Sequence, residues 1–375
     1  MVKNLHMVDL HGQYAKIQDE ILSEIHNTLD TAQFINGPKV ERFADALANY
    51  LSCDYVIPCA NGTDALQIAL MALDLQPGDE VIVPSFTYVA TAEVIALLQL
   101  TPIMIDVDPD TFNVTAELIE PHITSKTKAI VPVHLFGQNV DLEPILELAR
   151  RHNIWVVEDA AQSIGADYTF RDGRKMKSGT MGHIGCTSFF PSKNLGCYGD
   201  GGAIFTRDAE LAKKIKMIAN HGQSQRYYHE VIGVNSRLDA LQAGILLVKL
   251  AHLDEYGHAR YQAAQWYHHQ FEGNPHLSTP FEAPYTSHVY HQYTLKVNNG
   301  QRDALDRYLT EQHIPHSIYY PVPLYQQNAF APFRGLVDFL PVTDQLCKSV
   351  ISLPIHTEMD ESMVQYISSV VNNFF

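Results

Sequence analysis

Short apolar runs alternate with helical patterns along the first half of this chain. The apolar runs are "YVIPCA", "EVIVPS", "TPIMIDV", "KAIVPVHLFG" and "IWVVEDA", and the helical patterns cover 64–74, 90–98, 115–122 and 142–152. A strand that is apolar along its whole length needs cover on both faces, which parallel strands obtain from the helices that connect them. The alternation therefore predicts an α/β fold with a mostly parallel sheet and right-handed connections.

The sequence pattern differs at the two ends of the chain. Residues 14–30 carry isoleucine and leucine at helical spacing, and a turn at Asn36–Pro38 precedes a second helix. After about residue 240 we expect one long helix over 236–271, two strands in "HVYHQYTLKV" and "PHSIYYPV", and a final helix over 361–375.

The length of 375 residues favours two domains. We expect a large α/β domain over residues 1–245, including the N-terminal helical segment, and a smaller C-terminal α+β domain over residues 246–375.

The charge balance narrows the classes of partner. A net charge of −16 argues against nucleic acid or an anionic membrane surface as the main partner, although a few local donors can still bind a small anion.

No apolar stretch reaches the roughly 18 residues of a membrane helix, and Met1–Leu10 lacks the apolar core of a signal peptide. The 5 cysteines lack CxxC spacing, which favours a cytoplasmic, thiol-reduced protein. The 19 histidines form no cluster at ligand spacing, so no metal site is predicted.

Ligands of open α/β sheets bind at the carboxyl ends of the strands, and one predicted strand ends in two acids. In "NIWVVEDAAQSIGA", Glu158 and Asp159 must point to opposite sides, so only one of them can face a ligand. A buried acid is costly unless it meets a cation or a proton donor. Asp159 is either a helix N-cap or a carboxylate that keeps a heteroaromatic nitrogen protonated.

Two further strand ends carry residues suited to a phosphorylated ring. In "CANGTDALQIALMAL", Gly62 allows close backbone approach, while Thr63 and Asp64 can cap a helix whose N-terminus suits a phosphate. This turn lacks the lysine of a nucleotide P-loop and equally fits a simple cap. In "PSFTYVATAEVI", Tyr88 or Phe86 either offers a flat face to a ring or packs in the core.

A single lysine stands in the stretch "SFFPSKNLGCYGDGGA". In partly apolar surroundings the amine of Lys193 loses affinity for its proton and becomes nucleophilic, although most loop lysines are solvated charges. The glycines that follow leave space for a bulky group, and Ser188 can offer a hydroxyl to a phosphate. Together, the four sites supply what pyridoxal phosphate requires: an amine for the aldehyde, an acid for the ring nitrogen, an aromatic face and a phosphate cradle.

Seven motifs of this chain together resemble those of one enzyme family. The chain resembles the DegT/DnrJ/StrS nucleotide-sugar aminotransferases, which are fold-type I pyridoxal-phosphate enzymes, along essentially its whole length. The motifs stand in family order: "NGTDAL", "PSFTYVATA", "HLFGQ", "EDAAQSIGA", "SFFPSKNLGCYGDGGAI", "HGQ" and "GVNSRLDALQA". The resemblance implies a large, mostly parallel-sheet domain followed by a smaller C-terminal α+β domain.

The resemblance also implies roles for individual residues toward the cofactor. Lys193 is the Schiff-base lysine and carries the proton between the two reacting carbons, and Asp159 pairs with the pyridine nitrogen. Gln162 contacts the 3′-oxygen of the ring, and Tyr88 stacks on the ring face. Gly62, Thr63 and Ser188 hold the phosphate. Asn235 reaches the phosphate of the neighbouring subunit, so a homodimer with shared active sites is expected.

On the substrate side, the family implies that Arg237 and the segment "SIYYPVPLY", with Tyr319 and Tyr320, line the nucleotide-sugar pocket. The loop "NGPKVERF", which contains Lys39, closes over that pocket. Arg237 is a candidate for either the diphosphate or a sugar carboxylate.

The retained lysine favours transamination, because one branch of the family replaces it by histidine and becomes a 3-dehydratase. The sequences of the motifs are most similar to those of the UDP-2-acetamido-2-deoxy-3-oxo-glucuronate aminotransferases. These enzymes take the amino group from glutamate and release 2-oxoglutarate. Their products are amino sugars of surface polysaccharides such as lipopolysaccharide. The alternatives are a 4-keto-6-deoxy or dTDP-3-keto sugar as substrate, a dehydratase, and a non-catalytic regulatory protein that binds the cofactor or a sugar nucleotide.

Overall fold

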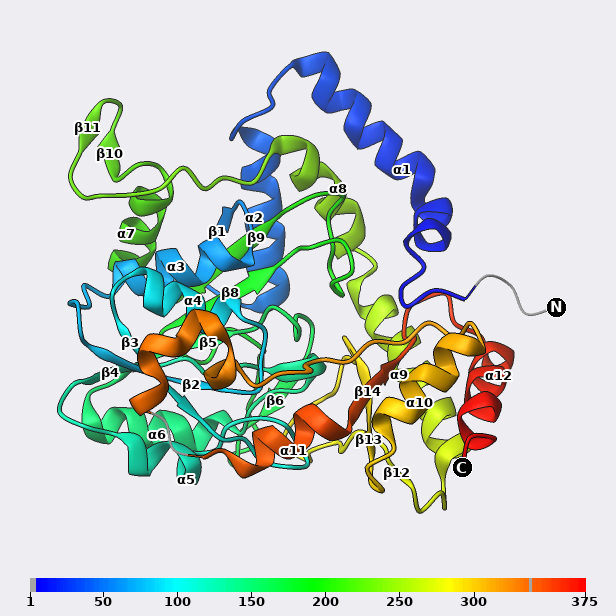
Figure 1. Cartoon of the computed structure of the whole chain (residues 1–375). Coiled ribbons are helices and arrows are strands. Elements are labelled where there is room, and N and C mark those ends of the chain that lie inside the picture. The colour runs from blue at the N-terminus through cyan, green and yellow to red at the C-terminus, as the bar shows by residue number, and fades with distance from the viewer. Residues whose placement is uncertain (1–4, 337–338) are drawn as a thin grey trace.

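A seven-stranded sheet forms the centre of the computed structural model, which describes residues 5–336 and 339–375 (Figure 1). Its strand order is β1-β9-β8-β5-β4-β2-β3. The neighbours from β8 to β3 are parallel, while β9 is antiparallel to both β8 and β1. The predicted, mostly parallel sheet is therefore present, with β1 as one edge. The strands are β1 Tyr55–Cys59, β2 Glu80–Pro84, β3 Thr101–Ile105, β4 Thr127–Ile130, β5 Trp155–Asp159, β8 Ile184–Ser188 and β9 Gly202–Thr206.

Helices cover both faces of this sheet, as its continuous apolar strands require. In β9, Ile204 packs under α3 and α7, whereas Ala203 and Phe205 pack under α2 and α8 on the other face. Farther along the sheet, α4 covers the first face, and α5 and α6 cover the second. The helices are α2 Pro38–Leu51, α3 Gly62–Ala72, α4 Ala90–Leu97, α5 Ala116–Ile119, α6 Leu142–His152, α7 Ala209–Ala219 and α8 Ala240–Leu250.

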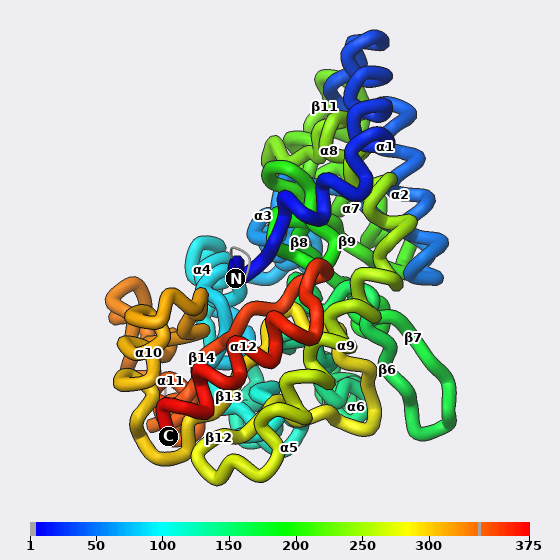
Figure 2. The backbone as a smooth tube through the Cα atoms, turned by 90° about the vertical axis from the view of Figure 1, so that its right-hand side faces the viewer, coloured from blue at the N-terminus to red at the C-terminus, as the bar shows by residue number. Residues whose placement is uncertain are grey.

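The C-terminal part builds a second, smaller sheet of three antiparallel strands, β12 to β14. Tyr293 and Leu353 of this sheet share an apolar cluster with Tyr267 of α9, Leu305 of α10 and Val364 of α12. These elements are α9 Leu253–Phe271, β12 Leu277–Ser278, β13 Tyr293–Val297, α10 Arg302–Glu311, α11 Pro341–Ser349, β14 Val350–Leu353 and α12 Glu361–Asn372. Figure 2 shows α1 (Leu10–Thr31), α2 and α8 gathered at one end of the molecule and α9, α10, α11 and α12 toward the other.

Shorter elements connect the main ones. The hairpin β10–β11 projects from the body beyond α7 (Figure 1). The remaining bounds are β6 Asp167–Thr169, β7 Lys175–Lys177, β10 Gln223–Gln225 and β11 Tyr228–His229, with 3-10 helices at Glu120–His122, Leu135–Gly137, Leu324–Gln326 and Asn328–Leu336.

The N-terminal helix α1, Leu10–Thr31, begins earlier than its apolar pattern indicates. The reason is a cap, because the carboxylate of Asp9 accepts a hydrogen bond from the backbone N–H of Gly12. Among the described residues, no helix combines the length and the apolar character needed to cross a bilayer.

Two expectations for the C-terminal part are wrong. The long helix over 236–271 is two helices, because the chain leaves α8 at Leu250 and starts α9 at Leu253. The break lets α8 pack on α1 and α2 while α9 packs on α12. The segment "PHSIYYPV" forms no strand and pairs only through a bridge between Ser317 and Ser352, and in "HVYHQYTLKV" only Tyr293–Val297 is a strand. The boundary expected after residue 245 falls inside α8, and the division into two domains stays a prediction.

Candidate active site

A cavity of about 710 Å³ lies at the carboxyl ends of the parallel strands. Asp159 ends β5, Ser188 ends β8, and Tyr88 follows β2, so residues far apart in the sequence meet at this edge. Most of the residues that we expected to hold a cofactor or substrate line this cavity: Gly62, Thr63, Tyr88, Asp159, Gln162, Ser188, Lys193, Tyr319 and Tyr320.

Lys193 follows β8 in a turn that is fixed by its own backbone, whose N–H donates to the carbonyl of Phe190 at 2.8 Å. Burial lowers the pKa of its amine to about 8, and the nearby carboxylate of Asp159 opposes that shift. A much larger share of the amine is therefore neutral near pH 8 than in a solvated lysine. This amine has the properties of a nucleophile and of a base.

The two acids at the end of β5 point to opposite sides, as the alternation predicts. Asp159 lines the cavity, where one carboxylate oxygen accepts from the hydroxyl of Thr91 at 2.7 Å and the other from the N–H of Ala161 at 3.1 Å. Glu158 is fully buried and accepts hydrogen bonds from the ring of His134 and from the N–H groups of Gly179, Met181 and Gly182. The carboxylate of Asp159 is thus held in place and presented to the cavity.

The alternative interpretation of Asp159 as a helix N-cap is wrong. Turns, and no helix, follow it over residues 161–165. Its bond to the N–H of Ala161 instead closes a local turn of the kind that aspartate side chains commonly make.

The start of α3 forms a second wall of the cavity. Asn61, and not Thr63 or Asp64, caps this helix, because its side chain accepts from the N–H of Asp64 at 2.8 Å. The sequence pattern had favoured Thr63 and Asp64 for this role. The N–H groups of Gly62 and Thr63 precede the first hydrogen bond of the helix, which Ala65 donates to Asn61, so they are free to bind an anion.

Glycine is required at this wall because two backbones come close together. A Cβ atom at Gly62 would lie 2.7 Å from Cβ of Ser188, and one at Gly202 would lie 2.5 Å from the carbonyl of Asn61. The missing side chains let the end of β8, with its Ser188 hydroxyl, approach the start of α3. Hydroxyl and backbone N–H groups therefore converge at one end of the cavity.

Of the two candidate aromatic residues, only Tyr88 lies at the cavity. Its side chain is 58% exposed, whereas Phe86 is 1% exposed and packs edge-on against Phe112 and Phe136. Phe86 is therefore a core residue.

A hydrogen-bond chain orients Gln162 beside the lysine. Its side-chain oxygen accepts from the N–H of Phe136 at 2.8 Å, and its amide nitrogen donates to the hydroxyl of Tyr320 at 3.3 Å. Phe136 adopts a left-handed conformation with φ 57°, which turns the "HLFGQ" segment toward the cavity. The C-terminal segment and the large sheet thus meet at this contact.

Besides Asn61, sequence reasoning missed three residues of this site. Thr91 and Phe136 lie inside motifs that were singled out, but nothing marked their side chains. His291 also lines the cavity, and its burial, together with the nearby charges of Lys193 and Arg260, holds its imidazole pKa well below the usual value. No sequence signal points to His291, since its place depends on how the C-terminal segment folds back onto the large sheet.

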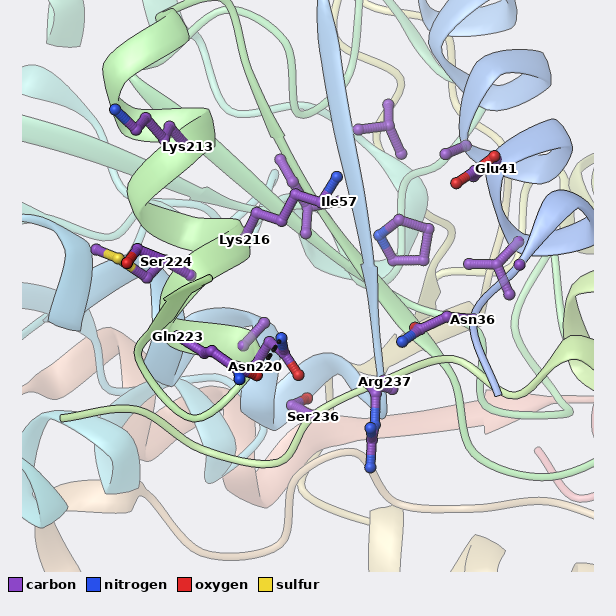
Figure 3. Close-up of a pocket in the computed structure, with 17 residues that line it drawn as sticks. Asn36, Glu41, Ile57, Lys213, Lys216, Asn220, Gln223, Ser224, Ser236 and Arg237 are labelled. Carbon is purple, nitrogen blue, oxygen red and sulfur yellow. Dashed lines mark hydrogen bonds between the residues drawn. The ribbon is translucent and has the colours of Figure 1, made fainter. Parts of the chain in front are cut away.

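Three residues that were expected to bind the cofactor or the substrate do not line this cavity. Asn235 is exposed, in a bridge with Asn220, and Arg237 lines a different cavity that Figure 3 shows. The amine of Lys39 bonds to Glu24 and Thr28 of α1, so its expected contact with substrate stays a prediction that this placement does not support.

The residues around the cavity fit pyridoxal phosphate. Lys193 presents an amine without a hydrogen-bond partner among the described residues, Asp159 presents a carboxylate, and the glycine-lined start of α3 presents free N–H groups. These three groups match an aldehyde, a pyridine nitrogen and a phosphate.

Comparisons with known proteins agree with this geometry. The model of the DegT/DnrJ/EryC1/StrS aminotransferase family matches residues 15–372. The chain is 45% identical to the UDP-2-acetamido-2-deoxy-3-oxo-D-glucuronate aminotransferase of Pseudomonas aeruginosa, over 98% of this chain and 100% of that one. It is 43% identical to the UDP-N-acetyl-3-dehydro-alpha-D-glucosamine 3-aminotransferase of Acidithiobacillus ferrooxidans, over 97% and 96% of the two chains.

It is also 42% identical to a pleiotropic regulatory protein of Geobacillus stearothermophilus, over 99% of each chain. Among solved structures, an aminotransferase of the same family from Brucella abortus superposes with a TM-score of 0.93 at 39% identity, over 99% of each chain. A Bacillus subtilis protein solved with the bound cofactor PMP superposes with a TM-score of 0.87 at 31% identity, over 96% of this chain and 82% of that one. The chain therefore belongs to the DegT/DnrJ/EryC1/StrS family of pyridoxal-phosphate-dependent aminotransferases.

Proposed function

We propose that the protein moves the amino group of glutamate to a nucleotide-linked ketosugar, and that the sugar is a UDP-3-keto-N-acetyl-hexuronate. The observation that carries the proposal is the amine of Lys193, unpartnered and with a lowered pKa, in the same cavity as the fixed carboxylate of Asp159. The names of two relatives, both UDP-3-ketosugar aminotransferases at 45% and 43% identity, support the substrate.

The cavity residues that were expected to bind the cofactor or the substrate have distinct tasks in this proposal. The cofactor, when bound, supplies a conjugated ring that withdraws electrons from the carbon being deprotonated. Lys193 holds the cofactor and, as a free amine, takes a proton from the α-carbon of glutamate and returns one to the sugar carbon. Asp159, kept in place by Thr91, holds the ring nitrogen protonated.

The remaining residues position the cofactor and substrate. Gly62, Thr63 and Ser188 receive the phosphate, Tyr88 covers the ring face, and Gln162 binds the 3′-oxygen. Tyr319 and Tyr320 line the side on which the sugar enters. The support for these roles is that all of these residues border one cavity.

We further propose that the protein is a homodimer in which Asn235 and Arg237 act on the active site of the neighbouring subunit. Both lie outside the active cavity of their own chain, which is where residues that act on a neighbouring subunit are expected.

We propose a cytoplasmic location, as the cysteine pattern predicts, and a product that enters lipopolysaccharide or another surface polysaccharide.

The test is a panel of UDP- and dTDP-linked 3-keto and 4-keto sugars, each incubated with glutamate and holoenzyme and analysed by mass spectrometry. The proposal predicts that the UDP-3-keto-hexuronate gains an amino group while glutamate becomes 2-oxoglutarate. Amino transfer to 4-keto-6-deoxy or dTDP sugars alone would show that the assigned substrate is wrong. Loss of water would indicate a dehydratase.

A non-catalytic regulatory role is the second candidate, favoured by the similarity to the Geobacillus stearothermophilus protein. Absorbance of the holoenzyme after one equivalent of glutamate separates the two functions. A shift from the pyridoxal to the pyridoxamine form supports the aminotransferase, and an unchanged spectrum supports the regulator.

A further inference from the structure

His291 is a polar residue of the active cavity that the proposed function leaves without a task. It is 5% exposed, and the buried Nδ1 atom of its ring has no hydrogen-bond partner among the described residues. Folded proteins rarely leave a buried polar atom unpaired, because its lost hydrogen bonds to water are then not replaced. An unpaired atom at the wall of an active cavity therefore points to a partner that is present during the reaction.

The backbone around His291 is fixed by a buried cation. Arg260 of α9 is 2% exposed, and its guanidinium donates to the carbonyl of Tyr290 at 3.2 Å and to that of Ile355 at 2.9 Å. A third, longer bond reaches the carbonyl of His291 itself at 3.5 Å. Because Tyr290 precedes β13 and Ile355 follows β14, the guanidinium fixes the backbone of His291 to the small C-terminal sheet.

The same segment is joined to the motif that carries the lysine. Asn194, which follows Lys193, donates from its side-chain amide to the carbonyl of Val289 at 2.8 Å. The N–H of Val289 donates to the carbonyl of Gly137 at 2.9 Å. Gly137 has φ 107°, and a Cβ atom there would lie 2.8 Å from the backbone nitrogen of His291. The lysine turn and the "HLFGQ" segment therefore both hold His291 at the cavity wall.

The imidazole of His291 is a neutral group near a cationic one. Burial and the charges of Lys193 and Arg260 hold its pKa well below the usual value, so the ring carries no charge at neutral pH. The effect of Lys193 on this pKa places the amine within electrostatic range of the ring. A neutral imidazole keeps one nitrogen lone pair, and with it the ability to accept a hydrogen bond from an ammonium group.

The amine of Lys193 needs such an acceptor while it carries a proton. In the proposed function it takes a proton from the α-carbon of glutamate and returns one to the sugar carbon, so it is an ammonium group between the two steps. An ammonium group at a buried site is unstable unless acceptors replace the lost water. The nearby carboxylate of Asp159 favours the protonated amine, but in the proposed function Asp159 is paired with the ring nitrogen of the cofactor. A further acceptor is therefore required beside the amine.

We infer that Nδ1 of His291 accepts a hydrogen bond from the ammonium group of Lys193 and so stabilises the lysine while it carries the proton between the two carbons. The ring proton of His291 then lies on Nε2, and His291 itself neither gains nor loses a proton. The inference rests on the proposed function, because it concerns the base of that reaction. His291 acts through the lysine and is a positioning residue.

Acetylation of Lys193 in the cofactor-free protein tests the pairing without any catalysis. Acetic anhydride modifies neutral amines, so the extent of modification of the Lys193 peptide between about pH 6 and about pH 10, measured by mass spectrometry, gives the pKa of this amine. His291→Phe removes the acceptor and should lower that pKa from about 8 to about 7. His291→Asn retains an acceptor oxygen near the position of Nδ1, and should keep the pKa within about 0.3 of the wild-type value.

His288→Phe is the matched control for a general disturbance of the segment. His288 is 8% exposed, stacks on Tyr290 and accepts a hydrogen bond from its N–H, but does not line the active cavity. This variant loses that bond, so it should lower the Tm at least as much as His291→Phe while the pKa of Lys193 stays unchanged. An unchanged pKa in His291→Phe, or an equal shift in His288→Phe, would overturn the inference.

The holoenzyme provides a second readout. His291→Phe should lower kcat for amino transfer about 3–10-fold, because a lysine of lower pKa is a weaker base, and should leave the KM of the ketosugar within about twofold. His291→Asn should recover most of the lost rate. A raised KM with an unchanged pKa of Lys193 would make His291 a substrate contact and overturn the inference. Failure of the wild-type enzyme on every ketosugar instead counts against the proposed function, while acetylation of Lys193 still tests the pairing.

Discussion

Lys193 combines a chemical group that every lysine has with surroundings that few lysines share. Burial removes water from its amine and lowers its pKa, while the nearby carboxylate of Asp159 favours the protonated form. Lys16, by contrast, is 65% exposed and pairs with Glu358 at the surface. The pKa of the amine is therefore set by its buried position in the turn after β8, and this position has measurable consequences.

The first consequence concerns stability and pH. The folded-state pKa of Lys193, about 8, is below its unfolded value of 10.5, so folding opposes the bound proton. This penalty is fully present below about pH 8 and disappears as the pH rises through the unfolded pKa. The Tm of the cofactor-free wild-type protein should therefore rise relative to that of Lys193→Met between about pH 8 and pH 10.5. A constant difference in Tm between the two proteins over this range would show that the amine has an ordinary pKa.

The neighbouring acids Glu158 and Asp159 should respond to the same change in opposite ways. Asp159→Asn removes the charge that holds the ring nitrogen protonated, so amino transfer should fall about 100-fold or more while Tm changes little. In the wild-type protein, backbone N–H groups donate to the carboxylate of Glu158, and Glu158→Gln replaces that carboxylate by an amide, whose NH₂ group cannot accept these bonds. It should lower the free energy of unfolding by about 1–3 kcal/mol. Single-turnover absorbance and urea denaturation of both variants measure the two effects, and a large loss of stability in Asp159→Asn would contradict the separation.

At the scale of elements, the phosphate end of the cavity depends on how closely α3 and β8 approach. Gly62→Ala brings a Cβ atom to 2.7 Å from Cβ of Ser188, so one element must move and the free N–H groups lose their positions. The Kd of pyridoxal phosphate should rise about tenfold or more, because charge-assisted hydrogen bonds at a helix N-terminus depend on these positions.

Gly257→Ala is the matched control for that change. A Cβ atom at Gly257, inside α9, meets no atom within 4 Å. The substitution should leave cofactor affinity unchanged and stabilise the helix by about 0.5–1 kcal/mol. Equilibrium dialysis with both variants gives the comparison, and equal affinities for the cofactor would show that close approach at Gly62 is not needed.

The elements that sequence patterns predict are those whose own residues determine them. The parallel strands follow from apolar runs, and the positions of Asp159 and Ser188 follow because each ends its strand. The break between α8 and α9 was missed because the helical pattern continues through it, and only the separate partners of the two helices require the turn. The segment with Tyr319 and Tyr320 looks strand-like in composition, yet it pairs with β14 only at Ser317.

At the scale of the whole molecule, contacts between distant segments account for what the sequence did not predict. His291 reaches the cavity from the C-terminal segment, and Lys39 is held by Glu24 of a different helix. Such pairings depend on the complete fold. Motifs placed the lysine, the acid and the phosphate cradle because these residues stand at strand ends, where the fold class alone fixes the location.

We also predict that the protein assembles as a homodimer. Asn235 and Arg237 lie outside the active cavity of their chain, and exposed apolar residues flank both cavities. Sedimentation equilibrium should therefore give a mass of about twice the 42.1 kDa of the chain. A monomer at the concentrations where the enzyme is active would contradict a shared active site.

The central claim is that Lys193 carries the cofactor. The direct test is to reduce the holoenzyme with borohydride, digest it, and locate the pyridoxyl group by peptide mass spectrometry. The account predicts one modified peptide, with the pyridoxyl group on Lys193. Modification of another lysine, or of none, would contradict it.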